Sequence, residues 1–154
     1  MRLSTKSRYG IRAIFDIAYH SGGQPTQIKE ISRRQGVTPR YLEQIFQKLK
    51  RAGIVKSIRG PKGGYYLAQK PQNIAVSDVI RAMEESMEPV FCARPPKGRK
   101  KCHRESHCVA QLVWREAGRR ISEYFESVSI EKMCEMAKEL GMEKQLDHRF
   151  MYFI

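Results

Sequence analysis

The 154-residue sequence lacks any apolar run approaching the roughly 20 residues that a membrane-spanning helix needs. Its first ten residues, MRLSTKSRYG, carry basic side chains but not the apolar stretch of a secretory signal peptide. From these two absences we expect a cytoplasmic protein with no membrane partner. Since that compartment keeps thiols reduced, the four cysteines are interpreted as metal ligands or reactive thiols before disulfides.

Acidic residues are scarce in the first half of the chain. Residues 1–70 contain 15 Lys and Arg and only three acids, Asp16, Glu30 and Glu43, a net charge of +12. Residues 71–154 contain 14 Lys and Arg against 13 acids, a net charge of +1, and the two halves add to the overall +13. A basic first half on an otherwise balanced chain favours a module that binds a polyanion such as nucleic acid.

Enzyme signatures are missing as well. The sequence contains no catalytic serine elbow, paired-carboxylate site, Walker motif or internal repeat. Its length allows one ordinary domain, or a small domain with an appended helical piece, and leaves no room for a large enzyme. We therefore predict that the protein is not an enzyme. The one catalytic arrangement left open is a reactive loop cysteine with His103 or His107 as its base.

Three helices are predicted in the basic half. Apolar residues recur at helical spacing over residues 4–19. A shorter helix opens at Thr26, its expected N-cap, and ends near Gly36, and a third starts after Thr38 with Pro39 at its first position. The short QGVTP connection between the last two is typical of a helix-turn-helix, in which the second helix enters the major groove of DNA.

The third helix has two distinct faces. Its inward face is predicted to be Leu42, Ile45, Phe46 and Leu49, which leaves an outward stripe of Arg40, Glu43, Gln44, Gln47 and Arg51. Arg pairs with guanine, Gln with adenine, and Glu accepts from the cytosine amino group, so this stripe can read base edges. A merely solvated helix face would look the same, and the segment that follows is what favours DNA.

A hairpin follows the third helix. Residues 54–58 alternate as a short strand, and RGPKGGYYL at 59–67 predicts a tight turn into a second strand, because its glycines permit positive φ. A strand-turn-strand unit after a helix-turn-helix is a wing. Arg59 and Lys62 at its tip are expected to reach a minor groove or the flanking phosphates.

The second half is predicted to be helical around a cysteine-containing loop at 91–108. Ser77 is expected to cap a short helix, and a long helix over 108–126 carries a wide apolar stripe: Val109, Leu112, Val113, Ala117, Ile121 and Phe125. Such a stripe predicts burial against a second copy of the chain, with packing inside the monomer as the alternative. A last helix over 130–140 ends at Gly141, and the apolar end of the chain is expected only to pack.

The loop FCARPPKGRKKCHRESHC concentrates Cys92, Cys102 and Cys108 in a segment rich in Pro, Gly, Lys and Arg. Free cysteine usually packs as a small buried hydrophobe, so three in such a loop indicate chemistry, whereas Cys134 on the last helix is expected to pack in the core. Three thiolates suit an iron–sulfur cluster, zinc or a redox-reactive thiol switch. The spacings C-x9-C and C-x5-C lack the close pairs of structural zinc sites, which argues mildly against zinc.

Three segments resemble one protein family: MRLSTKSRYGIRAI at the start, TPRYLEQIFQKLKRAGIVKSIRGPKGGYYLA in the middle, and the three cysteines between a short helix and a long one. By these residues the chain resembles the IscR-type (Rrf-type) family of bacterial winged helix-turn-helix iron–sulfur transcriptional regulators, relatives of NsrR. The resemblance implies a mainly α fold with a small β-hairpin wing and a long dimerisation helix. It implies a homodimer on double-stranded operator DNA, with Glu43 and Gln44 at base-reading positions and Arg59 at the tip of the wing. Together with the rest of the third helix and the turn, the expected DNA contacts are Arg40, Tyr41, Glu43, Gln44, Gln47, Arg51, Arg59, Gly60 and Lys62.

The expected organisation is a winged helix-turn-helix DNA-binding domain at 1–70, dimerisation helices with the cysteine loop at 71–141, and a C-terminal tail at 142–154. The resemblance further implies that Cys92, Cys102 and Cys108 hold an iron–sulfur cluster, 2Fe–2S in preference to 4Fe–4S. DNA binding would then sense iron–sulfur status, oxidative stress or nitric oxide. The alternatives are a clusterless thiol- or ligand-responsive winged-helix repressor, or a basic nucleic-acid-binding protein without regulation.

Three departures from the family pattern leave the fourth ligand open. The first gap between cysteines is longer than in the best-known members, Gln111 stands where IscR has a histidine ligand, and Arg8 stands where NsrR has an aspartate ligand. The candidates that remain are an external thiol or water, or a side chain of His103, His107, Glu105 or Cys134. His107 directly precedes Cys108, and neighbouring side chains on a helix diverge by about 100°, so this pair needs a local loop to share a metal.

Overall fold

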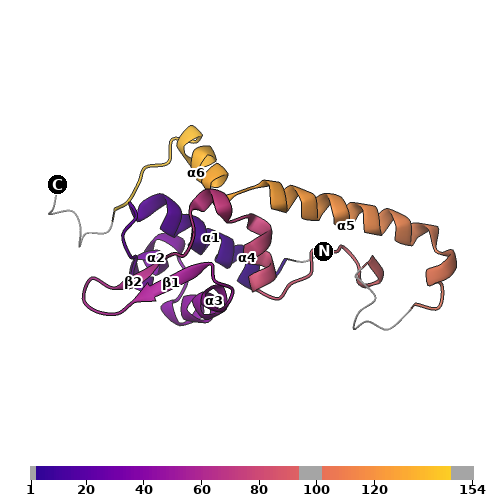
Figure 1. The fold of residues 1–154 in the computed structure, drawn as a ribbon, viewed down its shortest axis with the longest axis horizontal. Coiled ribbons are helices and arrows are strands. Elements are labelled where there is room, and N and C mark those ends of the chain that lie inside the picture. Colours follow the sequence, from indigo (N-terminus) through magenta and orange to yellow (C-terminus); the bar gives the residue numbers. More distant parts are fainter. Residues whose placement is uncertain (1–2, 94–101, 147–154) are drawn as a thin grey trace.

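A computed structural model of the chain describes residues 3–93 and 102–146. A lobe at one end is built from α1 (Thr5–His20), α2 (Ile28–Gln35), α3 (Pro39–Arg51), the hairpin β1 (Val55–Ile58) and β2 (Gly64–Leu67), α4 (Val76–Ala82) and α6 (Ile130–Glu139), while the long helix α5 (Val109–Ser127) projects from it (Figure 1). Short 3-10 turns lie at η1 (Pro71–Asn73), η2 (Phe91–Ala93) and η3 (Glu105–His107). The predicted mainly α winged helix-turn-helix with a long helix is confirmed.

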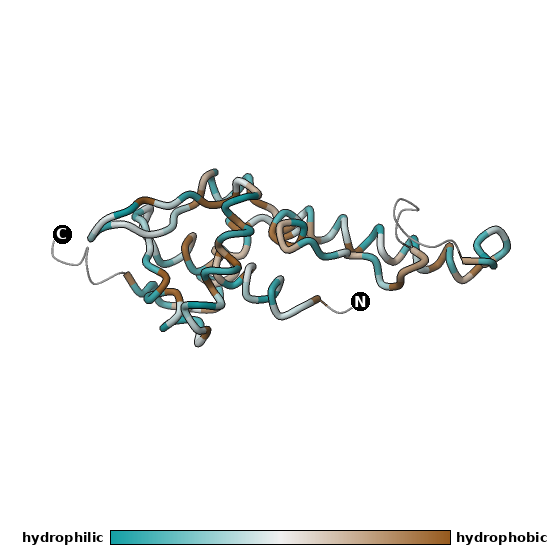
Figure 2. Tube along the Cα trace, turned by 90° about the horizontal axis from the view of Figure 1, so that it is seen from below, coloured by the Kyte–Doolittle hydropathy of each residue, from teal (hydrophilic) through white to brown (hydrophobic). Residues whose placement is uncertain are grey.

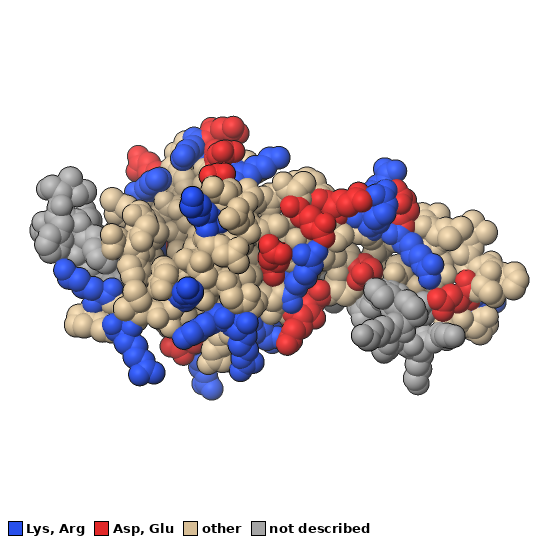
Figure 3. Space-filling model, in the orientation of Figure 1, with Lys and Arg blue, Asp and Glu red and all other residues tan. Residues whose placement is uncertain are grey.

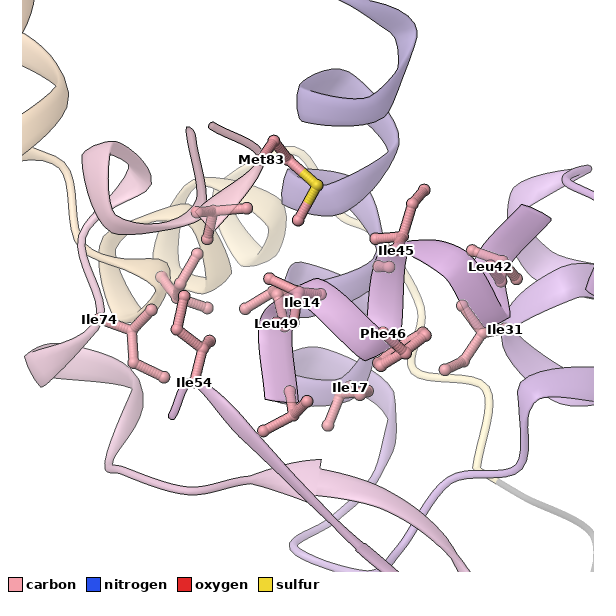
Figure 4. Packing of buried hydrophobic residues seen from close by; sticks show 14 of the residues in the cluster. Ile14, Ile17, Ile31, Leu42, Ile45, Phe46, Leu49, Ile54, Ile74 and Met83 are labelled. Atoms are coloured by element: carbon pink, nitrogen blue, oxygen red, sulfur yellow. The ribbon is translucent and has the colours of Figure 1, made fainter. Parts of the chain in front are cut away.

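The larger of two apolar clusters forms the core of the lobe, and Figure 4 shows side chains from several helices converging there. Its fully buried members include Ile14 and Ile17 of α1, Ile31 of α2 and Ile74 after the hairpin. The predicted inward face of the third helix is confirmed, because Leu42, Ile45, Phe46 and Leu49 are all at most 1% exposed. Burying that face fixes the rotation of α3 about its own axis and directs its other side outward.

Local signals set the ends of the helices that the sequence predicted best. The Ser4 hydroxyl accepts a hydrogen bond from the Lys6 amide at the start of α1. Thr38 caps α3, with Pro39 in the first turn, as predicted. Gly36 closes α2 with a left-handed φ of 64°, a conformation that glycine adopts without steric cost.

Thr26 does not cap the second helix, and that prediction was wrong. The helix begins at Ile28, and the backbone of Thr26 pairs instead with Tyr65 of β2 through two hydrogen bonds of 2.8 Å. Thr26 thereby adds a third extended segment to the wing. The approach is so close that a Cβ on Gly64 would lie 2.4 Å from the Thr26 carbonyl oxygen.

Ser77 does not cap α4 either. The helix begins one residue earlier, and the Asp78 carboxylate accepts from the Ala75 amide at 2.9 Å. Ser77 is fully buried within the helix, where its hydroxyl accepts a hydrogen bond from Arg81. A carboxylate stabilises this helix start more than a hydroxyl would, because its negative charge also interacts favourably with the positive end of the helix dipole.

The chain returns to the lobe after α5 through a short backbone pairing. The Val76 amide donates to the Val128 carbonyl and the Ile130 amide donates to the Ile74 carbonyl, both at 2.9 Å, which brings α6 against α1. The last helix ends as predicted, with Gly141 in a left-handed conformation. Residues 142–146 lie over α1, where the Tyr19 hydroxyl donates to the Met142 carbonyl at 2.6 Å.

The predicted apolar end of the chain, residues 147–154, lies outside the described residues. Within the described part of the chain, no helix is long and apolar enough to cross a membrane.

Candidate nucleic-acid interface and cysteine loop

The outward face of α3 is a continuous polar stripe. The predicted base readers are all exposed there: Arg40, Glu43, Gln44, Gln47 and Arg51. Figure 3 shows Lys and Arg side chains gathering along the lower side of the lobe, where Figure 1 places α3 and the hairpin. Burial, followed by the negative charge of the Glu43 carboxylate, raises the pKa of Tyr65 in the wing.

The wing is tied to α3 by a side-chain hydrogen bond. In the hairpin Val55 pairs with Leu67 and Ile58 with Gly64. The Lys50 ammonium donates to the Ser57 hydroxyl at 2.8 Å, joining α3 to β1. The tip residues predicted to contact DNA are exposed and lie in the turn between the strands: Arg59, Gly60 and Lys62.

Tyr41 is the predicted DNA contact whose side chain is only partly accessible. Its ring is half-buried and meets the Tyr9 ring of α1 edge-on, with centroids 6.0 Å apart and an interplanar angle of 86°. This contact stabilises the packing of α3 on α1, so Tyr41 has a structural role whether or not it also contacts DNA.

Two lysines that were not among the predicted DNA contacts lie beside the stripe. Lys48 of α3 and Lys6 of α1 line a hollow of about 140 Å³ together with the predicted readers Gln44, Gln47 and Arg51. Lys48 follows Gln44 by four residues, which places both on one side of a helix. That spacing was visible in the sequence and is the signal that could have identified Lys48.

The three loop cysteines occupy the two ends of a segment whose middle, 94–101, lies outside the described residues. Cys92 lies in η2, Cys102 begins the second described part, and Cys108 is the N-cap residue of α5. All three are half-buried free thiols. Over residues 3–93 and 102–146, no group of three His, Cys, Asp or Glu side chains is arranged to hold a metal ion, so the described structure does not bring the three thiols together.

Gln111 joins the two ends of this loop. Its side chain is almost fully buried, and the Gln111 Nε2 donates to the Cys92 carbonyl at 2.8 Å. Its backbone amide donates to the Cys108 carbonyl at 3.1 Å. Gln111 therefore holds the turn of Cys92 against the start of α5. From the sequence it was noted only as standing at the position of a histidine ligand.

The candidate fourth ligands differ in their surroundings. His103 and His107 are exposed, and Nδ1 of His107 lies 2.7 Å from the Ser106 hydroxyl. Glu105 forms an ion pair with Arg115 at 3.4 Å. Cys134 packs against the core of the lobe, as predicted, and burial raises the pKa of its thiol.

The length of α5 separates Cys134 from the loop. At 1.5 Å per residue its 19 residues span about 28 Å. Within one chain Cys134 therefore lies at the far end of α5 from Cys108.

The long helix exposes its apolar stripe. Val109, Leu112 and Val113 are 75%, 62% and 61% exposed, and Tyr124 near the other end is 64% exposed. Figure 2 shows hydrophobic residues recurring along the projecting helix. Packing inside the monomer, the alternative weighed for this stripe, accounts for its second half, because Ala117, Ile121 and Phe125 are half-buried and Phe125 packs against a buried cluster of the lobe. It leaves the first half, Val109, Leu112 and Val113, exposed.

Comparisons with known proteins agree with this architecture. Residues 3–136 match the family model Rrf2, described as iron-dependent transcriptional regulator. The HTH-type transcriptional regulator IscR of Aliivibrio salmonicida (strain LFI1238) is 41% identical over 130 residues, covering 84% of this chain and 75% of the relative.

Two solved structures are similar over most of the chain. T. potens IscR has a TM-score of 0.75 and 36% identity, covering 99% of this chain and 97% of that one. CymR (YrzC), the global cysteine regulator of B. subtilis, has a TM-score of 0.71 and 32% identity, covering 88% and 98%. These relatives are named as regulators, which agrees with the prediction that the protein is not an enzyme. The chain belongs to the Rrf2 family of iron-dependent transcriptional regulators.

Proposed function

We propose that this transcriptional regulator is a cytoplasmic homodimer whose binding to operator DNA is controlled by an iron–sulfur cluster held by Cys92, Cys102 and Cys108. The observation that carries the proposal is that three free, half-buried thiols flank one loop, and that Gln111 ties the turn of the first to the helix start of the last. The family description as iron-dependent regulators supports an iron-containing group at these thiols.

The DNA-binding part of the proposal assigns residues 1–70 as the reading domain. The exposed stripe of α3 would enter the major groove, where Glu43 and Gln44 select bases and Arg40, Gln47 and Arg51 contact guanine edges, adenine edges or phosphates. The wing tip would reach the minor groove or the phosphates through Arg59, Gly60 and Lys62. The contact between Lys50 and Ser57 would keep helix and wing in a fixed relation during binding.

The dimer part of the proposal rests on α5, within the proposed dimerisation region 71–141. A long helix on which Val109, Leu112 and Val113 are each more than half exposed favours burial of this part against the same helix of a second copy. Two-fold pairing would present two α3 helices to half-sites about one DNA turn apart. The proposed tail, 142–154, contributes packing on α1 through its described residues.

The chemistry of the loop residues fits an iron–sulfur cluster. Thiolates are its usual protein ligands, and Cys92 and Cys108 lie on the two sides of the Gln111 side chain, at the turn and at the N-cap of α5. A bound cluster, 2Fe–2S in preference to 4Fe–4S, would supply a centre sensitive to iron–sulfur supply, oxidants and nitric oxide. The accessible His103 and His107 are the proposed alternatives for the fourth ligand.

The decisive experiment combines an absorption spectrum of protein purified without oxygen with iron, acid-labile sulfide and zinc analysis. Cys92→Ala, Cys102→Ala and Cys108→Ala should each abolish visible absorption and the matched iron and sulfide, while Cys134→Ala, the matched control, should keep them. A colourless protein that stays colourless after reconstitution would overturn the cluster. Zinc on the same thiols would redirect the assignment to a zinc site.

A second candidate is a clusterless thiol- or ligand-responsive repressor. The likeness to CymR, titled a global cysteine regulator, is the observation that favours it, because that relative shares the fold over 88% of this chain. This candidate predicts DNA binding that follows oxidant or a small thiol compound with no visible chromophore. The same spectrum, taken with a DNA-binding titration in the presence and absence of oxidant, separates the two.

A further inference from the structure

The helices α1, α3 and α4 pack together (Figure 1). A basic hollow lies among the start of α1, the middle of α3 and the end of α4. The 140 Å³ hollow beside the base-reading stripe adjoins a second, more open one of about 440 Å³. The two share their lining at Lys6, Tyr41, Lys48 and Met83. The second hollow ends at Glu84 and Glu85, in the turn that follows α4.

A carboxylate stands among the cations of this hollow. The Glu84 Oε2 accepts a hydrogen bond from the Lys48 ammonium at 2.5 Å. That hydrogen bond and the charge of Lys48, followed by the charges of Arg51 and Lys6, hold the pKa of Glu84 below its usual value. Since the Glu84 side chain is 80% exposed, another anion can replace it from solvent without any rearrangement of the core.

The backbone holds Glu84 in an unusual conformation. Its φ of 62° is the one positive value at a non-glycine residue in the described part of the chain. Such a conformation persists where the surroundings define it, and it is common at functional positions.

The backbone conformation of Glu84 is held in place through its neighbour Glu85. The Glu85 carboxylate accepts from the Ser4 amide at 3.0 Å, from the Ser7 hydroxyl at 2.7 Å and from the Ser4 hydroxyl. Glu85 therefore fixes the turn to the start of α1 and directs the side chain of Glu84 toward α3.

Three cations beside a base-reading helix form a site for a singly charged oxyanion. DNA presents such a group at every nucleotide, and cationic side chains that flank a recognition helix normally contact phosphates. In the hollow, Lys48 and Arg51 come from α3 and Lys6 comes from the start of α1, so an occupying anion would bridge the two helices. In the DNA-free structure the Glu84 carboxylate pairs with one of these cations, Lys48, in the adjoining open hollow that Lys6 and Lys48 also line.

We propose that Lys6, Lys48 and Arg51 bind one DNA backbone phosphate in each half-site, and that the Glu84 carboxylate occupies this phosphate site in the DNA-free protein. Glu84 is then a competitor that lowers DNA affinity until the phosphate displaces it from Lys48. The proposal rests on the proposed function, because it requires α3 to lie in the major groove.

The position of Glu84 in the chain connects the phosphate site to the cysteine loop. Glu84 precedes Cys92 by eight residues, and the connecting segment packs on α5, where Pro89 Cδ would lie 3.2 Å from a Cβ on Gly118. A change in the cysteine loop therefore acts on the same short segment that carries the competing carboxylate. Withdrawing Glu84 would strengthen DNA binding, and holding it against Lys48 would weaken binding.

The test measures DNA affinity of the full-length protein over a range of salt concentrations. The probe is a duplex recovered by selection from a random-sequence pool with the wild-type protein. Glu84→Gln should bind about two- to fivefold more tightly per half-site, the range expected for release of an exposed ion pair. Its salt dependence should be steeper, by up to about 0.9 in the log–log slope for each additional phosphate contact.

Three further variants make the result specific. Glu84→Gly removes the carboxylate where glycine suits the backbone, and it should match Glu84→Gln. Lys48→Gln should weaken binding and abolish the effect of Glu84→Gln in the double variant. Glu126→Gln removes one exposed acid that pairs with Arg81, away from this hollow, and it should leave affinity unchanged.

Equal tightening by Glu126→Gln would mean that net charge alone is responsible, and the proposal would be overturned. It would also be overturned if Glu84→Gln bound no more tightly, or if its effect persisted without the Lys48 ammonium. Failure of the wild-type protein to select any duplex would instead refute the DNA-binding assignment itself. The selection step thus separates failure of the proposed function from failure of this inference.

Discussion

Asp16→Ala should be among the most destabilising single substitutions in the lobe. Asp16 of α1 is fully buried, and its carboxylate accepts hydrogen bonds from the Nε and Nη2 atoms of Arg34 in α2, the shortest at 2.7 Å. It also accepts from the Gln35 side chain at 2.8 Å. Arg34 is itself only 3% exposed, so the substitution leaves a guanidinium buried without its main partner.

The expected cost is about 3–5 kcal/mol, the range observed when one partner of a buried ion pair is removed. A carboxylate oxygen of Glu30 lies 3.5 Å from Arg34 and offers a second acceptor, so we expect the lower part of that range. For a chain of this size 1 kcal/mol corresponds to roughly 2–4 °C in melting temperature, so a cost of about 3–4 kcal/mol predicts a fall of about 6–16 °C. Because α2 is the first helix of the helix-turn-helix, DNA affinity should fall with stability.

Urea and thermal unfolding followed by circular dichroism would measure this cost for Asp16→Ala, Arg34→Met and the double variant. The double variant should lose less than the sum of the single ones, because it removes the buried charge that each single variant leaves unpaired. Arg120→Ala, which breaks an exposed pair with Glu116, is the control and should change stability far less than Asp16→Ala, because exposed ion pairs contribute little. A cost for Asp16→Ala as small as that of the control would refute the reasoning.

Three other predictions test the wing, the tail and α5. Gly64→Ala would force a Cβ to 2.4 Å from the Thr26 carbonyl oxygen at a φ of +152°, so urea unfolding should show a loss of about 1–3 kcal/mol. Burial lowers the pKa of His20 below its usual 6.5, and its Nδ1 accepts a hydrogen bond from the Gln145 amide. The contribution of His20 to the free energy of unfolding should be complete above pH 6.5 and should fall as the pH drops through the lowered pKa. His20→Gln should remove this pH dependence. Leu112→Glu, at a position 62% exposed in the monomer, should convert the proposed dimer to a folded monomer in sedimentation, and an unchanged dimer would contradict the α5 interface.

The recognition helix was predictable because its signals are local. Thr38 and Pro39 mark its start, and a regular apolar spacing marks its buried face, so both the helix and its outward stripe follow from about 14 consecutive residues. The apolar stripe of α5 is visible in the same pattern, but its division into an exposed first half at Val109, Leu112 and Val113 and a half-buried second half depends on packing against the lobe. The predictable features depend on neighbours within one or two helical turns.

The features that the sequence did not reveal depend on contacts between distant segments. Thr26 has the composition of a helix cap, yet Tyr65, 39 positions later, offers its backbone a better partner. Asp16 and Arg34 look like ordinary charged residues until α1 and α2 pack and bury both. Glu84 is one of many acids in the second half, and only the fold brings it beside Lys48. Single contacts between segments so far apart in the sequence produce no periodic pattern from which they could be predicted.

Gln111 bears on how the three thiols of the proposed cluster site come together. Binding a cluster requires three segments to converge, and the entropic cost falls for every segment that the protein already holds in place. The buried Gln111 side chain, with its own backbone amide, connects the turn of Cys92 to the start of α5 beside Cys108 before any ligand binds. Only the part of the loop that carries Cys102 then remains to be positioned by the cluster. A glutamine in place of the expected histidine therefore gives up a ligand but keeps a structural connection between the two ends of the loop. The fourth ligand must come from elsewhere, and an exposed or external group at that position would leave the cluster open to the oxidants it is proposed to sense.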